Sequence, residues 1–319
     1  MKKNAMHKGE ILTVIMENAV TILLTAFVVF MICYRPSFSS WANITAIIND
    51  CCMYGITALG MTTVILCGEI DLSVSSIYAW ATCLFVILCN SMNVFVAALI
   101  TLCTGVIWGV FNGLMIAFLR MPAFVATLGT MYTVKGIAYY ITEQKPISTS
   151  NEMLAAIGKF NIADISIVPF VFIAVLLLLF WFMKYTKAGR AIYATGGNYE
   201  VARLSGINVK ASKIIVFIFT GICATLSGLM YCTRTYSGAA TYGADITTWC
   251  VAAAVIGGTS MSGGRGSVVR TIIGILLMAI LFNALTLLGV DGSWQRFIRG
   301  AVMVVVIMFD VASKMKSAK

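Results

Sequence analysis

The sequence predicts an all-α polytopic membrane protein, and the prediction rests on its composition and on long runs without charge. Of its 319 residues, 60% are hydrophobic and 11% are charged, with a mean hydropathy of +0.96, whereas a soluble domain carries about 25% charged residues. No charged residue occurs in Leu72–Leu119 or Thr271–Val290, and about 20 apolar residues cross a bilayer as one helix. Because the apolar residues are continuous rather than alternating, we expect helices and not a barrel.

The apolar runs divide into about ten expected spans, which form one transmembrane domain over residues 1–319. The spans are 18–34, 49–67, 72–90, 94–119, 122–142, 165–183, 212–232, 246–262, 267–289 and 294–312. The first span follows two lysines, but it is too long for a signal peptide and no small-residue cleavage site ends it. We therefore expect it to stay uncleaved.

The cations indicate the orientation, because Lys and Arg in short loops mark the cytoplasmic side. With ten spans, the cation-bearing regions before the first span, in segment 184–213 and after the last span share one face. Their cations are Lys2, Lys3, Lys8, Lys184, Lys187, Arg190, Arg203, Lys210, Lys213, Lys314, Lys316 and Lys319. Both termini are therefore expected in the cytoplasm, and the net charge of +10 reflects topology rather than nucleic-acid binding.

The cysteines and the lone histidine argue against a metal site or a disulfide framework. All ten cysteines lie in or beside apolar spans, and Cys51–Cys52 is the one close pair. No C-x-x-C motif repeats and His7 is the single histidine. We expect no metal and no cofactor, and we interpret the cysteines as small packing residues.

Polarity first enters the apolar sequence at Gly68–Ser73, between the second and third spans. One interpretation is a tight cytoplasmic turn in which Glu69 and Asp71 are both solvated. The other is a break within the membrane, followed by a half-helix whose N-terminus Asp71, Ser73 and Ser75 would cap. Broken helices commonly form substrate sites in transporters, so the second interpretation gives these residues a role in the pathway.

A second break is expected at Gly257–Ser267, where five glycines interrupt the apolar run. The segment is not a phosphate-binding loop, because no Gly-Lys-Ser/Thr follows the glycines. Glycine here favours a close approach of helices or a re-entrant turn. Gly257 and Gly258 are the candidate break residues.

The two breaks belong to a weak internal duplication of roughly 50–142 against 245–312. Downstream of each break lies a similar tetrad, Phe111–Leu114 in the first copy and Phe282–Leu285 in the second. In the ten-span orientation these tetrads lie on spans that run in opposite directions. The duplication would then be inverted, as in many transporters.

Each tetrad carries an amide inside an apolar helix, Asn112 in the first and Asn283 in the second. Such an amide either forms a hydrogen bond between helices, worth about 1 kcal/mol, or contacts the transported substrate. The sequence leaves both interpretations open.

Segment 184–213 is the one sizeable cytoplasmic loop that we expect. Gly196-Gly197 predicts a turn, and Asn198 can cap a short helix over Tyr199–Leu204. Ser205-Gly206 would end that helix, and a second helix would begin after Asn208.

This segment, YATGGNYEVARLSGINVKASK, resembles the cytoplasmic segment of the bacterial sugar-type ABC importer permeases, the ribose, xylose and autoinducer-2 permease family. Four further blocks, in order over about 60–310, resemble the same family. They are GEIDLSVSS, MPAFVATLGTMYTVKGIAYYIT, AAAVIGGTSMSGGRGSV and FNALTLLGVDGSWQ. Five ordered blocks make the resemblance specific.

The resemblance implies a permease in the bacterial cytoplasmic (inner) membrane that pairs with a second permease copy or homologue, two ATP-binding subunits and an extracytoplasmic sugar-binding protein. It also implies that the short helix and the turn after it couple to the ATPase, through Gly197, Asn198, Glu200, Arg203, Gly206, Ile207 and Asn208. Residues of the translocation pathway or its helix breaks would be Glu69, Asp71, Ser73, Asn112, Thr127, Gly257, Gly258 and Asn283. The chain itself has no ATPase motif, so it is expected not to be an enzyme.

The chain departs from the family pattern at both breaks. Glu69 and Ser75 replace glycines of the first motif. About ten positions before the second glycine pair the family often has an acidic residue, where this chain has Thr247 and Trp249, with Asp245 nearby. These departures bear on the identity of the solute.

The expected function is import of a monosaccharide or a related sugar-like solute, with ATP hydrolysed on a separate subunit. An ion-coupled secondary transporter is the alternative, but it needs ionisable residues in the membrane, and we expect few in the spans beyond Glu69, Asp71 and Lys135. An intramembrane enzyme would need acid–base clusters that the sequence lacks.

Overall fold

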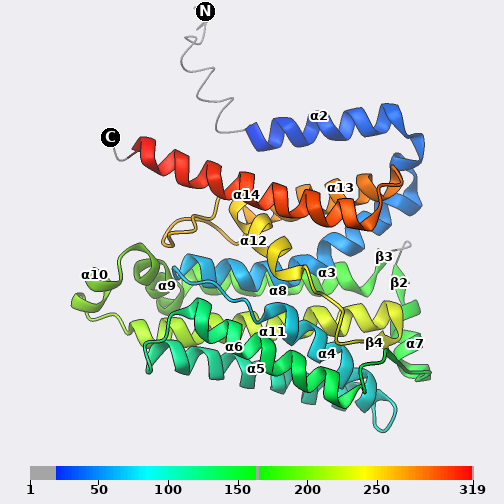
Figure 1. Cartoon of the computed structure of the whole chain (residues 1–319), viewed down its shortest axis with the longest axis horizontal. Coiled ribbons are helices and arrows are strands. Elements are labelled where there is room, and N and C mark those ends of the chain that lie inside the picture. The colour runs from blue at the N-terminus through cyan, green and yellow to red at the C-terminus, as the bar shows by residue number, and fades with distance from the viewer. Residues whose placement is uncertain (1–18, 163–164, 318–319) are drawn as a thin grey trace, which may run out of the picture.

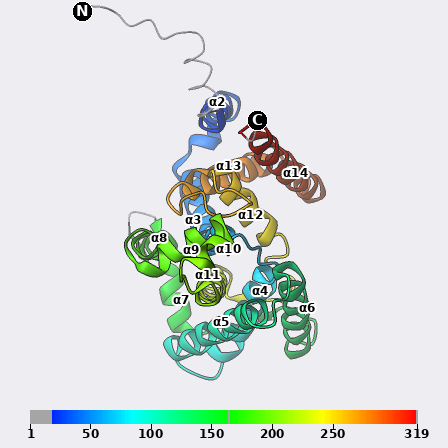
Figure 2. The same cartoon turned by 90° about the vertical axis from the view of Figure 1, so that its left-hand side faces the viewer.

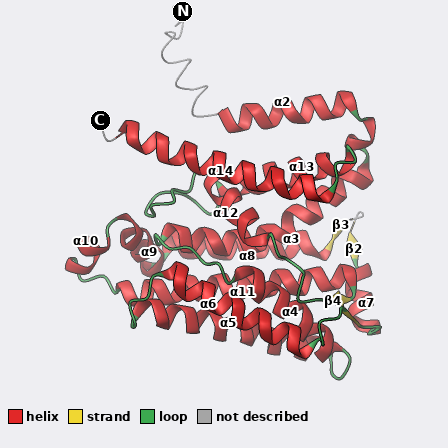
Figure 3. Cartoon of the chain, viewed as in Figure 1, coloured by secondary structure: helices red, strands yellow, loops and turns green. Residues whose placement is uncertain are grey.

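The computed structural model of the chain describes residues 19–162 and 165–317, and these residues are mostly helical (Figure 3). The helices are α2 (Ala19–Tyr34), a 3-10 turn η1 (Pro36–Ser39), α3 (Trp41–Leu66), α4 (Val74–Cys89), α5 (Val94–Ala117), α6 (Ala123–Ile141), α7 (Glu152–Lys159), α8 (Ile167–Tyr185), α9 (Lys187–Gly197), α10 (Tyr199–Leu204), α11 (Val209–Thr235), α12 (Ile246–Ile256), α13 (Thr271–Leu287) and α14 (Gly292–Ser317). Residue 18 and the cations Lys2, Lys3, Lys8 and Lys319, on which the expected orientation partly rests, lie outside the described residues.

Each expected span overlaps one helix, while α7, α9 and α10 lie in the expected loops. The helices α3, α5, α8 and α11 are each long and apolar enough to cross a membrane by themselves. The chain is therefore an all-α membrane protein. The largest boundary errors concern the second and eighth spans. The second was expected to begin at residue 49, but α3 begins at Trp41 after the cap at Ser40. The eighth was expected to reach residue 262, but α12 ends at Ile256, because glycines with positive φ follow at Gly258 and Gly263.

Helix α11 occupies the middle of the bundle and packs against α3, α4 and α5 (Figure 2). It approaches α5 closely through Gly105, Gly109 and Gly113, which recur every four residues along one face. A Cβ atom on Gly109 would lie 2.6 Å from the carbonyl oxygen of Phe217. Small residues at this spacing allow membrane helices to pack backbone to backbone, which fixes α11 at the centre.

The helices run along a common direction, so the bundle has two ends (Figure 1). Helices α9 and α10 lie at one end, α14 ends toward them, and α2 runs away from them. Helix α7 and the short strands lie at the other end. There β1 (Ile147–Ser148) pairs antiparallel with β4 (Ser237–Gly238), and β2 (Asn161–Ile162) with β3 (Ile165–Ser166).

Candidate functional site

The first break is built around a carboxylate that is fully buried. Asp71 is 0% exposed, and its Oδ1 accepts hydrogen bonds from the Ser73 backbone N–H at 2.8 Å and from the Ser73 hydroxyl at 2.6 Å. Asp71 therefore stabilises the turn that leads into α4, whereas the expected side-chain cap is absent, because Ser73 is the N-cap residue and makes no capping hydrogen bond to the helix. The side chain of Glu69 is 18% exposed and forms an ion pair with Lys213 of α11. The interpretation of a turn with both acids solvated is thus wrong, because helices cover the turn on several sides.

A chain of side-chain hydrogen bonds extends from this break into the neighbouring helices. The Asn112 amide of α5 donates to the Ser73 hydroxyl at 2.9 Å, and the Thr130 hydroxyl of α6 donates to the Asn112 carbonyl oxygen at 2.6 Å. Thr127 of α6 accepts a hydrogen bond from the backbone N–H of Leu72 at 3.1 Å. The predicted residues Asp71, Ser73, Asn112 and Thr127 thus lie together, and they tie α4, α5 and α6 to the break.

The second break meets the first at a contact of backbones that we call the glycine junction, formed by Gly68, Gly196, Gly263 and Gly264. The Gly264 N–H donates to the carbonyl oxygen of Leu66 at 2.9 Å. A Cβ atom on Gly263 would lie 2.8 Å from the Cα of Gly68 and 2.7 Å from the carbonyl oxygen of Gly196. The three segments can approach so closely because glycine has no side chain.

The sequence prediction of a turn at Gly196-Gly197 is wrong, since both residues belong to the last turn of α9. Their role is steric. A Cβ atom on Gly196 would overlap the carbonyl oxygen of Leu66 and lie 2.8 Å from the backbone nitrogen of Gly264. Helix α9 therefore touches both breaks at once.

Helix α10 has the predicted bounds and caps. The side-chain amide oxygen (Oδ1) of Asn198 accepts a hydrogen bond from the Val201 N–H at 3.0 Å, and Glu200 pairs with Arg203 at 3.1 Å. Gly206 ends the segment with φ +78°, and Asn208 caps α11 by accepting from the Ala211 N–H at 3.0 Å. The exposed large hydrophobic side chains of α10 are Tyr199, Val201 and Leu204, at 45%, 58% and 80%. The helix thus presents an unpaired apolar face.

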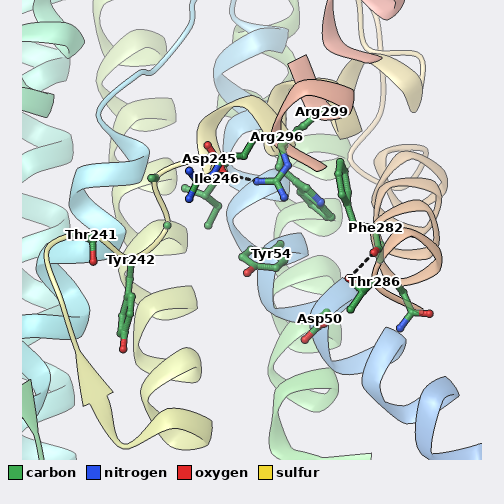
Figure 4. A pocket seen from close by; sticks show the side chains of 15 residues that line it. Asp50, Tyr54, Thr241, Tyr242, Asp245, Ile246, Phe282, Thr286, Arg296 and Arg299 are labelled. Carbon is green, nitrogen blue, oxygen red and sulfur yellow. Dashed lines mark hydrogen bonds and ion pairs between the residues drawn. The ribbon is translucent and has the colours of Figure 1, made fainter. Parts of the chain in front are cut away.

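A cavity of about 410 Å³ (Figure 4) lies between the start of α14, the end of α13 and the first half of α3, away from α9 and α10 (Figure 1). We call it the charged cavity. Its lining comes from α3, the segment before α12, the start of α12, and the facing parts of α13 and α14. The lining side chains include Asp50, Tyr54, Tyr242, Asp245, Trp249, Phe282, Asn283, Thr286, Arg296 and Arg299.

The charges in and beside this cavity are paired with one another. Asp245 binds Arg299 at 2.7 Å, and Arg299 also lies over the ring of Phe282, 4.5 Å from its centroid. Asp50 binds Arg234 of α11 at 2.8 Å. Nε of Arg299 is buried and forms no hydrogen bond. The cavity therefore offers carboxylate oxygens, guanidinium N–H groups and aromatic faces without a large excess of either charge.

Sequence reasoning missed most of this cavity. It underestimated the ionisable residues in the spans, since Asp50 lies in the expected span 49–67 and Arg296 and Arg299 lie in 294–312. Ionisable residues inside apolar helices were the signal that could have found them. Of the departures noted near the second break, Asp245 and Trp249 line the cavity, and Trp249 packs against Tyr54 with ring centroids 5.5 Å apart.

The two tetrads lie toward opposite ends of the bundle. Asn112 bonds to Ser73 beside the first break, whereas Asn283 bonds to Asn43 near the start of α3, at 2.8 Å and 3.1 Å. The helices before the breaks, however, run in the same direction, because the chain following each of them meets at the glycine junction. A single inversion therefore does not relate the two copies as wholes.

The comparisons with known proteins agree with the motifs. A family model described as "Branched-chain amino acid transport system / permease component" matches residues 43–307. The chain is 33% identical to the ribose import permease protein RbsC of Haemophilus influenzae, over 97% of this chain and 98% of the relative. It is 35% identical to RbsC of Escherichia coli K12, over 93% and 94%, and 32% identical to the L-arabinose transport system permease protein AraH of the same strain, over 89% and 87%.

No solved structure matches the chain. The family match covers most of the sequence, and the relatives align over nearly their whole length. Both the breaks and segment 184–213 fall within the matched residues. The chain belongs to the permeases of sugar-type ABC importers, within the broader family of transport-system permease components.

Proposed function

We propose that the chain is the membrane subunit of an ATP-driven importer for a monosaccharide or a related sugar-like solute. It forms the translocation pathway and couples to cytoplasmic ATP-binding subunits. The observation that carries the coupling is the glycine junction. Helix α9, which continues into α10 through Asn198, contacts both helix breaks through the backbone at Gly196, and its Tyr193 hydroxyl also donates to the carbonyl oxygen of Gly266 at 3.2 Å. A displacement of α10 would therefore be transmitted to both breaks.

The orientation that we propose has ten spans and both termini in the cytoplasm of a bacterial cell with the protein in its inner membrane. The positive-inside bias of segment 184–213 supports it. The directions of the first and last helices also support both termini lying on the side of α9 and α10, because α14 ends toward these helices and α2 runs away from them (Figure 1). The charged cavity then lies in the outer half, where a sugar released by an extracytoplasmic binding protein enters.

The solute class follows from the lining of the charged cavity and from the relatives. Paired carboxylates and guanidinium groups offer acceptors and donors for hydroxyl groups, and Tyr54 and Phe282 offer apolar faces. Two relatives are named for ribose and L-arabinose. A neutral polyhydroxylated ring suits such a site, and a second permease copy or homologue would complete the pathway.

The test replaces Gly206 by proline. Gly206 has φ +78°, which proline cannot adopt because its ring fixes φ near −65°. The turn after α10 must then rearrange. We expect Gly206→Pro to reach the membrane normally but to lose most co-purification with the ATP-binding subunits and most ATP-driven uptake of labelled ribose or L-arabinose in membrane vesicles.

The matched control is Gly289→Pro. Gly289 also has a positive φ, +73°, its N–H also bonds to a carbonyl three residues earlier, and a Cβ atom at either glycine meets open space. It lies at the other end of the bundle, so the variant should keep ATPase association. Equal loss in both variants, or normal ATP-driven uptake in Gly206→Pro, would refute the assignment of α10.

An ion-coupled secondary transporter is the second candidate, and the Asp50–Arg234 and Asp245–Arg299 pairs are what favour it. Such pairs can bind and release protons as a cavity opens. Uptake that survives ATP depletion but stops when a protonophore collapses the gradient would establish this mechanism. Uptake that needs ATP and resists the protonophore supports the importer.

A further inference from the structure

A second pocket lies at the end of the bundle that carries α9 and α10, and we call it the basic pocket. Its volume is about 340 Å³. The turn between α5 and α6 forms one wall, and the starts of α10 and α11 form the other. The lining residues are Glu69, Ile116, Ala117, Arg120, Met121, Pro122, Ala123, Tyr199, Val209, Lys210 and Lys213.

The basic pocket holds three cations and one carboxylate. Glu69 pairs with Lys213, whereas Arg120 and Lys210 have no ion pair with any described carboxylate. The ammonium group of Lys210 lies 4.5 Å from the centroid of the Phe118 ring, which neutralises no charge. The pocket therefore keeps an excess of two positive charges, and a phosphate group is an anion that such a cluster binds well.

Arg120 is held at the pocket by an unusual backbone. Its φ is +56°, a left-handed conformation that costs a residue with a side chain about 1 kcal/mol or more. The fold keeps this conformation even though Arg120 forms no side-chain hydrogen bond within the described residues. Backbone strain of this kind is common at ligand sites, and here it accompanies an unpaired guanidinium group.

Apolar side chains lie exposed beside the same pocket. Phe118, Leu119 and Phe124 are 56%, 70% and 58% exposed, and they flank the α5–α6 turn that carries Arg120. In a membrane protein such side chains face acyl chains. A basic pocket bordered by a lipid-facing apolar surface fits a ligand that has an anionic head and apolar tails.

We propose that the basic pocket binds the phosphate headgroup of an anionic phospholipid, with Arg120 and Lys210 as its principal contacts. The acyl chains would lie along Phe118, Leu119 and Phe124. Placing this lipid in the cytoplasmic leaflet rests on the orientation proposed above, but the binding itself does not. The phosphate would also compete with Glu69 for Lys213, which connects lipid binding to the first break.

The test measures lipid binding to the purified, delipidated full-length chain by native mass spectrometry. The protein is titrated with phosphatidylglycerol and, separately, with phosphatidylethanolamine. We expect a clear preference for phosphatidylglycerol. In the double variant Arg120→Gln/Lys210→Gln, the affinity for phosphatidylglycerol should fall about 30-fold, because each cation near a lipid headgroup contributes on the order of a fivefold factor.

Two variants control the experiment. Lys145→Gln/Lys159→Gln removes two exposed cations near the opposite end of the bundle and should leave the preference unchanged. Arg120→Lys/Lys210→Arg keeps the charges and should retain most of the affinity. The lipid affinities are measured on the purified chain alone, so their outcome does not depend on whether the chain imports sugar.

Three results would overturn the proposal. The first is equal binding of both lipids by the wild-type chain. The second is displacement of phosphatidylglycerol by glycerol phosphate at a matched concentration, which would identify a site for soluble anions. The third is unchanged lipid binding in Arg120→Gln/Lys210→Gln together with lost co-purification of the ATP-binding subunits, which would make the pocket a protein docking surface.

Discussion

The glycine junction and the charged cavity are built in opposite ways. At the junction, segments from α9 and from both breaks meet through backbone atoms, and Gly196 and Gly263 leave no room for a side chain. In the charged cavity, long side chains such as Arg299 and Tyr54 line an open space, and their contacts are ion pairs and tilted contacts between aromatic rings.

This difference indicates that the glycine junction is suited to transmitting movement and the charged cavity to binding and releasing the solute. Backbone contacts transmit a displacement because they have no rotamers to absorb it. Ion-paired side chains can exchange partners when a solute arrives or leaves. We therefore expect the junction to tolerate almost no substitution, and the charged cavity to tolerate conservative changes that alter its selectivity.

The largest effect should come from Gly196→Ala. The new methyl group would overlap the carbonyl oxygen of Leu66 and displace the Gly264 N–H that bonds to it. Overpacking of this kind costs about 1–3 kcal/mol, and more where backbone must move. We expect the free energy of unfolding in detergent to fall by about 3 kcal/mol and sugar uptake to be nearly abolished.

The neighbouring glycine supplies the control. A Cβ atom on Gly197 meets its nearest neighbour, the Cα of Gly264, at 4.0 Å, an ordinary contact distance. Because alanine is a better helix former than glycine by about 1 kcal/mol, Gly197→Ala should fold at least as well as the wild type and keep its uptake. If both variants behave alike, the junction is not the rigid contact described above.

The sequence predicted the local features around α10 and the two helix breaks well. The bounds of α10, the cap at Asn198 and the positions of both breaks follow from short-range chemistry, in which capping amides and glycines act on residues within a few positions. The Gly105, Gly109 and Gly113 stripe was not predicted, although glycines every four residues are a known signal for close packing of membrane helices.

The long-range contacts could not be predicted in the same way. Nothing within Gly196-Gly197 distinguishes a turn from a helix end pressed against another backbone, because the partner Leu66 lies far away in sequence. The ion pairs Asp50–Arg234 and Asp245–Arg299 join residues from different helices. Arg234 falls between the expected spans 212–232 and 246–262, and the sequence analysis considered neither Asp50 nor Arg299 as a partner for another charge.

A smaller effect is expected in the charged cavity. Asp245→Asn or Arg299→Gln removes one partner of an ion pair whose side chains are 41% and 21% exposed. Each single variant should lower the free energy of unfolding by about 1–2 kcal/mol, and the double variant by less than their sum. Each should also change the KM for sugar uptake while ATPase association stays normal.

Arg296→Gln is the matched control for this pair. Arg296 lies on the same helix and approaches the same carboxylate, but at 4.0 Å and with 78% of its side chain exposed. Its removal should change the free energy of unfolding by less than about 0.5 kcal/mol. Additive losses in the Asp245→Asn/Arg299→Gln double variant would contradict the assigned coupling, and the cavity would then depend on packing alone.

The smallest effect on stability should come from the two tetrad amides, Asn112 beside the first break and Asn283 in the charged cavity. Their effects on the KM for uptake should distinguish the two regions. Asn112 is fully buried and bonds to Ser73 and Thr130, so Asn112→Leu loses two hydrogen bonds between helices. At an average of about 0.6 kcal/mol for each bond in a membrane, the free energy of unfolding should fall by about 1 kcal/mol, as thermal and denaturant unfolding in detergent would measure. The KM for uptake should not change.

Asn283 bonds to Asn43 but also lines the charged cavity, so Asn283→Leu should combine a similar loss of stability with a raised KM. The sequence left two interpretations open for these amides, a hydrogen bond between helices and a contact with the solute. We expect the first to hold for Asn112 and the second for Asn283. Asn112 would then connect helices beside the first break, and Asn283 would contact the solute in the charged cavity. A raised KM in Asn112→Leu with an unchanged KM in Asn283→Leu would reverse that division, and it would move solute recognition from the charged cavity to the polar side chains of the first break.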